Sequence, residues 1–245
     1  MAPSLPAKNW RMAREWTRAA VGNQGRRHII FWILPTAVSS ALVLAYFSGN
    51  PLLRNFVASP ANREFGLLEH LQSLIICMAF IGGVLGYRRA DSWVEKTACA
   101  LFAGGSALML LEEIDYGLHY WEWAFGDSGL VTLSIHNMDD NSALPEIKKA
   151  SNLILVLLFV VVPLAAGRFA DRRVVYFVPD RMLITTVVAA FAVSQLAHVL
   201  DKAGWYPDGP LTLNVSEFRE TFTYYAFMLY GLDLALHRRW PSEHT

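Results

Sequence analysis

The sequence predicts an all-α integral membrane protein, a bundle of about six transmembrane helices with both termini in the cytoplasm. Hydrophobic residues make up 54% of its 245 residues and charged residues 17%, below the roughly 25% charge of soluble domains. Six stretches reach the length of about 20 mainly apolar residues that a helix needs to cross a bilayer. Lys and Arg residues gather on alternate connections between these stretches, as the positive-inside rule requires.

Residues 1–28 form a basic N-terminal segment ahead of the first apolar stretch. It places Trp10 and Trp16 among Arg11, Arg14 and Arg18. This pattern is typical of an amphipathic helix that lies on the anionic surface of a membrane. A solvated basic tail is the alternative interpretation.

Residues 29–240 are predicted to form a single transmembrane domain, followed by a short tail at 241–245. The expected spans are 29–48, 66–87, 94–120, 151–168, 182–203 and 216–236. The third and sixth of these carry carboxylates within reach of the membrane, where charged groups are costly. All eight tryptophans lie outside the spans or at their edges, as expected for side chains that prefer the membrane interface.

The distribution of charge predicts the orientation of the bundle. Of the 21 Lys and Arg residues, 15 precede the first span, lie in or beside the second and fourth connections, or follow the last span. Cytoplasmic loops carry the excess of positive charge, so both termini are expected inside. The formal net charge is zero, which argues against nucleic acid as a partner.

This topology brings most of the unusual polar residues to the outer face. Glu112, Asp115 and His119 stand at positions i, i+3 and i+7, so they share one face if the third span is a continuous helix. In a helix over residues 93–121, Glu112 would lie roughly 13 Å below the outer interface. A charged side chain at such a depth usually faces the bundle interior and has a partner.

Carboxylates and imidazoles from several helices are the ligands with which helical bundles build iron or manganese sites, and zinc accepts the same groups. The cluster therefore predicts a divalent metal site of Fe, Mn or Zn. The expected ligands are Glu112, Asp115, His119, His136, His198, Asp201 and Glu217. Glu113 or Glu220 would act as the general base on a metal-bound water or would orient the ligands.

Structural roles are the alternative for several of these residues. Glu217 and Glu220 occupy the first turn of a predicted helix, where acids complement the helix dipole. Glu69 can be explained in the same way. His198 and Asp201, three residues apart, can form a hydrogen-bonded pair at the membrane interface.

Residues 112–117, with the sequence EEIDYG, and the later motif SIHN around His136 resemble a family of uncharacterised bacterial polytopic membrane proteins. That family carries the motifs E-E-I-S-W-G-Q and N-L-H-N. Asp115, Tyr116 and Leu118 replace its Ser, Trp and Gln. The resemblance implies a protein of the bacterial inner membrane and supports the same cluster of residues, without implying a reaction.

Three classes of function follow from the sequence. The first is a metal-dependent enzyme that acts on a lipid or a periplasmic small molecule. The second is a non-catalytic accessory or assembly subunit, with other membrane proteins and membrane lipids as its partners. The third is a proton-coupled transporter, because intramembrane acids can relay protons.

Overall fold

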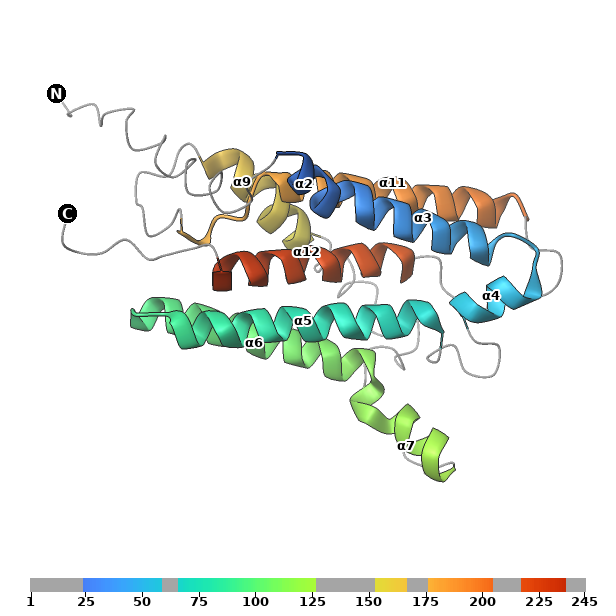
Figure 1. Ribbon diagram of the computed structural model, residues 1–245, viewed down its shortest axis with the longest axis horizontal. Helices are drawn as coiled ribbons and strands as arrows, with labels where there is room; N and C mark the ends of the chain where they lie inside the picture. Colours follow the sequence, from blue (N-terminus) through green and yellow to red (C-terminus); the bar gives the residue numbers. More distant parts are fainter. Residues whose placement is uncertain (1–23, 59–65, 127–152, 167–175, 205–216, 237–245) are drawn as a thin grey trace.

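The computed structural model describes residues 24–58, 66–126, 153–166, 176–204 and 217–236, and these parts are helical, without strands (Figure 1). The predicted N-terminal amphipathic helix, with Trp10 and Trp16, and the tail at 241–245 lie outside the described residues. The elements are α2 (Gln24–His28), η1 (Ile29–Ile33), α3 (Leu34–Tyr46), α4 (Pro51–Val57), α5 (Leu67–Arg89), α6 (Trp93–Glu113), η3 (Asp115–Gly117), α7 (Leu118–Phe125), η5 (Leu157–Val161), α9 (Val162–Ala165), α11 (Met182–Lys202) and α12 (Glu217–Leu236).

Four helices are long and apolar enough to cross a membrane. They cover Gly25–Tyr46, Leu67–Arg89, Trp93–Glu113 and Met182–Lys202, and they correspond to the predicted first, second, third and fifth spans. The predicted fourth span is described only as a shorter apolar helix, Leu153–Ala165, which includes η5 and α9.

The predicted sixth span, 216–236, coincides with α12 in position but is more polar than the other long helices. Its charged residues Glu217, Arg219, Glu220 and Asp233 leave it without an apolar stretch as long as theirs. Figure 1 shows α12 between α5 and α6 on one side and α3 and α11 on the other. This central position lets α12 turn its polar groups toward other helices.

The third span differs from the prediction, because the helix is not continuous over 94–120. Helix α6 ends at Glu113, and Asp115, Tyr116 and Gly117 have positive φ angles of 48°, 54° and 82°. A helix cannot continue through left-handed backbone. The chain therefore bends, and α7 leaves the bundle (Figure 1).

Small residues let α5 approach α6 and α12 closely. A Cβ atom on Gly82 would lie 2.8 Å from the carbonyl carbon of Gly231 in α12, and one on Gly83 would lie 2.9 Å from the Cβ of Ala103 in α6. Close backbone contact through small residues is a common mode of helix packing in membranes. These contacts set the spacing of α5, α6 and α12.

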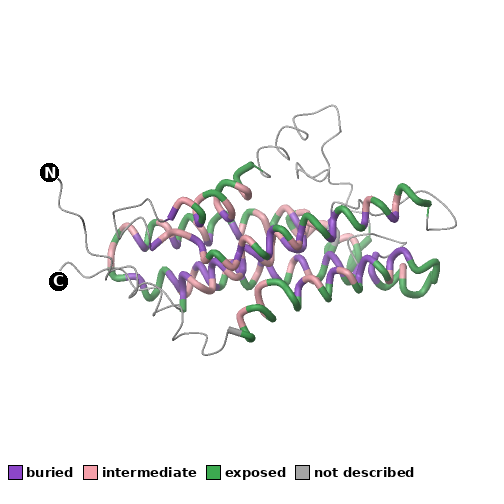
Figure 2. Tube along the Cα trace, turned by 90° about the horizontal axis from the view of Figure 1, so that it is seen from above, coloured by how far each residue is buried: buried purple, intermediate pink, exposed green. Residues whose placement is uncertain are grey.

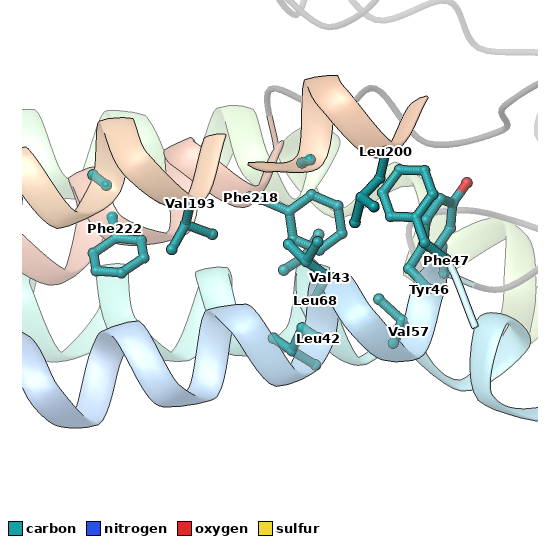
Figure 3. Close-up of a cluster of buried hydrophobic side chains, with 13 residues drawn as sticks. Leu42, Val43, Tyr46, Phe47, Val57, Leu68, Val193, Leu200, Phe218 and Phe222 are labelled. Atoms are coloured by element: carbon teal, nitrogen blue, oxygen red, sulfur yellow. The ribbon is translucent and has the colours of Figure 1, made fainter. Parts of the chain in front are cut away.

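Apolar side chains join α12 to the other half of the bundle. Phe218 and Phe222 of α12 are buried against Val193 and Leu200 of α11 and against Val43 of α3 (Figure 3). Figure 2 shows that buried and exposed positions alternate along the helices, with the exposed sides facing outward.

The outward faces are themselves apolar. Leu101 and Leu108 of α6 are 72% and 62% exposed, and Leu74 of α5 is 58% exposed. Large exposed apolar surfaces are rare on soluble monomers. This surface suits contact with lipid chains.

Candidate functional site

Three buried carboxyl groups meet where α5 and α12 begin and α6 ends. Glu69 lies in the first turn of α5, Glu113 is the last residue of α6, and Glu217 is the first residue of α12. Their side chains are 7%, 3% and 9% exposed. Together with the half-buried Glu220, they form what we call the carboxyl cluster.

Glu113 is at the centre of the carboxyl cluster. The hydroxyl of Tyr224 donates a 2.9 Å hydrogen bond to its Oε2 atom. Glu69, Glu217 and Glu220 all lie close enough to interact electrostatically with the carboxyl group of Glu113. One carboxyl group thus interacts with side chains from both neighbouring helices.

Helical spacing explains why α12 supplies three of these groups. Glu217, Glu220 and Tyr224 stand at positions i, i+3 and i+7, which places them on one face of the helix. That face points toward α5 and α6. On α5, Gln72 lies one turn after Glu69, so these two side chains also share one face of their helix.

Gln72 links α5 to α12 by hydrogen bonds beside the carboxyl cluster. Its side chain is fully buried, and Nε2 donates hydrogen bonds to the carbonyl oxygen of Glu217 at 2.9 Å and to the hydroxyl oxygen of Thr221 at 3.1 Å. The Thr221 hydroxyl in turn donates to the same carbonyl at 3.1 Å. The first turn of α12 is therefore held in place by polar contacts as well as by packing.

The chemistry of such a cluster follows from its donors and acceptors. An ionised carboxylate only accepts hydrogen bonds, so a hydrogen bond between two carboxyl groups requires a proton on one of them. Adjacent carboxylates in a buried site also repel each other when all are charged. The arrangement can therefore hold a proton that offsets part of the negative charge.

The two predicted general bases, Glu113 and Glu220, both belong to the carboxyl cluster, and so does one predicted metal ligand, Glu217. Another predicted ligand, Glu112, accepts a 2.5 Å hydrogen bond from the hydroxyl of Tyr116. This hydrogen bond raises the pKa of Tyr116, because ionisation of the phenol would break it and add a second negative charge beside Glu112.

The remaining predicted ligands are dispersed or undescribed. Asp115 lies in the turn after α6, so it does not share a helix face with Glu112 as the sequence predicted. His198 and Asp201 are half-buried near the end of α11. The side chain of His119 and the whole of His136 lie outside the described residues.

Within the described residues, no three His, Cys, Asp or Glu side chains lie where they could hold a metal ion together. Carboxylate oxygens in the carboxyl cluster are nevertheless chemically suited to hard cations. Sequence reasoning did not single out Tyr224 or Gln72. The signal available for both was a polar residue one or two turns from a glutamate on the same helix face.

Comparisons with protein-family models, with curated proteins and with solved structures gave no match for this chain. The motif resemblance to bacterial membrane proteins therefore stays an expectation. The chemistry of the site has to be argued from its own geometry.

Proposed function

We propose that this chain is a six-span protein of the bacterial inner membrane, with both termini in the cytoplasm, whose carboxyl cluster binds and releases a proton at the outer face. In this proposal Glu113 carries the proton, and its protonation changes how α5, α6 and α12 pack. The observation that carries the proposal is the burial of Glu113 between Glu69 and Tyr224 at the end of an apolar helix.

Several features support this function over a metal-dependent enzyme. The described residues contain no three-ligand group for a metal, whereas a proton on Glu113 would relieve the repulsion among Glu69, Glu113, Glu217 and Glu220. Ionisable residues inside a membrane bundle commonly serve as proton relays. The carboxyl groups come from three helices, so protonation can alter how α5, α6 and α12 pack.

Infrared spectroscopy of the protein in lipid vesicles tests this proposal directly. We expect the carbonyl stretch of a protonated carboxyl group to decrease as the pH is raised. The Glu113→Gln variant should lack this change, because glutamine keeps the size and the acceptor for Tyr224 but cannot exchange the proton. The matched control is Glu112→Gln, which changes the half-exposed neighbour and should leave the signal intact. An unchanged signal in Glu113→Gln would contradict the proposal.

A structural role in an accessory subunit is the second candidate, and the contacts of Gln72 and Thr221 favour it. These side chains bond to the backbone and to each other, as expected for a polar fastening between helices. In that case the Glu113→Gln substitution would leave the infrared titration the same as in the wild type, and the purified protein would retain other membrane subunits.

Elemental analysis of the purified protein completes the comparison. Near-stoichiometric iron, manganese or zinc that disappears in Glu217→Gln would favour the metal-dependent enzyme, with its substrate a lipid or a periplasmic small molecule. Proton exchange at Glu113 alone predicts no such metal in either sample.

A further inference from the structure

A small pocket lies on the opposite side of α12 from the carboxyl cluster. Arg219 follows Glu217 by two residues, which turns it about 200° around the helix axis. The pocket lies between α12, α11 and the helix Leu153–Ala165. Its lining consists of Arg219 and the residues Leu155, Val187, Ala190, Phe191, Phe222 and Thr223.

Arg219 is the charged group of this pocket. Its guanidinium makes no hydrogen bond or ion pair with any residue that the structure describes. Its backbone carbonyl accepts a 3.2 Å hydrogen bond from the hydroxyl of Thr223, but this contact leaves the side-chain charge without compensation. The half-buried guanidinium therefore has five donors available for an anion.

The position of Arg219 suits contact with lipid headgroups. Arg219 is the third residue of α12, so it lies near one end of the bundle. A long cationic side chain at the end of a membrane helix can reach the headgroup region while its stem stays among apolar groups.

The exposed surface beside the pocket matches the apolar part of an amphiphile. Val187, Ala190 and Phe222 are buried, whereas Phe191 is 39% exposed on the outer side of α11. Leu153 and Ile154, which start the neighbouring helix, are each 59% exposed. The pocket therefore adjoins the surface that we assign to lipid chains.

We propose that Arg219 binds the phosphate of an anionic phospholipid, whose acyl chain lies on the exposed apolar surface of α11 and the helix Leu153–Ala165 beside the pocket. Guanidinium groups pair with phosphate through two parallel hydrogen bonds. The proposal does not depend on proton exchange at Glu113, because the two sites occupy opposite faces of α12.

Native mass spectrometry of the purified full chain tests the proposal. With equal amounts of phosphatidylglycerol and phosphatidylcholine, we expect retention of phosphatidylglycerol by the wild type. Loss of one charge-assisted contact should lower that retention roughly tenfold in Arg219→Gln. The matched control is Arg88→Gln, which removes an exposed arginine in the last turn of α5 and should retain the lipid as the wild type does.

Three outcomes would overturn the proposal. Unchanged phosphatidylglycerol retention in Arg219→Gln would exclude the pocket, and an equal loss in Arg88→Gln would indicate general surface charge. Displacement of the lipid by excess inorganic phosphate, with phosphate bound in its place, would indicate a site for a free anion.

A photoreactive phosphatidylglycerol provides a test that needs no folded variant. With the reactive group on an acyl chain, the wild type should be labelled on peptides that contain Val187, Phe191 or Leu155. Labelling confined to other helices would also overturn the proposal.

Discussion

The hydroxyl of Tyr224 on α12 lies 2.9 Å from Oε2 of Glu113, the last residue of α6, and donates a hydrogen bond to it. The two residues are 111 positions apart in the chain, so the contact forms only when the bundle is assembled. It fixes the carboxyl group of Glu113 beside Glu69. Tyr224 therefore links the folding of α12 to the arrangement of the carboxyl cluster.

Replacing Tyr224 with Phe should weaken the bundle and change the protonation of Glu113. The loss of a hydrogen bond to a carboxyl group costs about 1.5–3 kcal/mol, which thermal unfolding in detergent can detect. The infrared signal of the carboxyl cluster should also move to a different pH. Tyr225→Phe is the matched control, because it removes a 2.8 Å hydrogen bond to the carbonyl of Ile30 and should lower stability without moving that signal. Equal infrared responses in both variants would contradict the assigned role of Tyr224.

A second prediction concerns Gln72. The change Gln72→Leu removes two buried hydrogen bonds and leaves Thr221 with one partner fewer. We expect a loss of about 1–3 kcal/mol in unfolding free energy. Gln195→Leu, on the exposed side of α11, is the matched control and should be neutral or slightly stabilising in a membrane. If the two variants unfold alike, the contact between Gln72 and α12 contributes little.

The sequence predicted the position of α12, because its acids precede a mainly apolar run. The described helix, Glu217–Leu236, lies within the predicted range of 216–236. Glu113, Glu217 and Glu220 were predicted as functional residues because acids beside an apolar run need compensation. Their convergence with Glu69 depends on how the helices pack, which no local pattern encodes.

The end of α6 was not predicted, and the reason is also local. The segment between Glu113 and Trp121 is rich in apolar and aromatic residues and contains no proline. Gly117 favours a positive φ, and Asp115 tolerates one. Tyr116 has no such preference, so its positive φ could not be anticipated from the residue type.

The close approach of α5 and α12 gives a third prediction. In Gly82→Ala the new Cβ atom would lie 2.8 Å from the backbone of Gly231, and backbone atoms cannot yield as a side chain can. We expect destabilisation of about 1–3 kcal/mol from overpacking, measured by thermal unfolding. Gly104→Ala is the matched control, because nothing lies within 4 Å of its Cβ position. There the better helix propensity of alanine should leave stability equal or slightly higher. The reverse order of stabilities would place α5 and α12 further apart than we describe.

The proposed orientation of the bundle can be tested by chemical labelling of single cysteines. Both native cysteines, Cys77 and Cys99, would first be replaced by alanine. Trp123 on α7 is 75% exposed at the end of the bundle that holds the carboxyl cluster, and Ser92 lies between α5 and α6 at the opposite end. If both termini are cytoplasmic, a membrane-impermeant maleimide should label Trp123→Cys in intact cells. It should reach Ser92→Cys only after the membrane is permeabilised. The opposite pattern would place the carboxyl cluster at the cytoplasmic face, and the proton would then exchange with the cell interior.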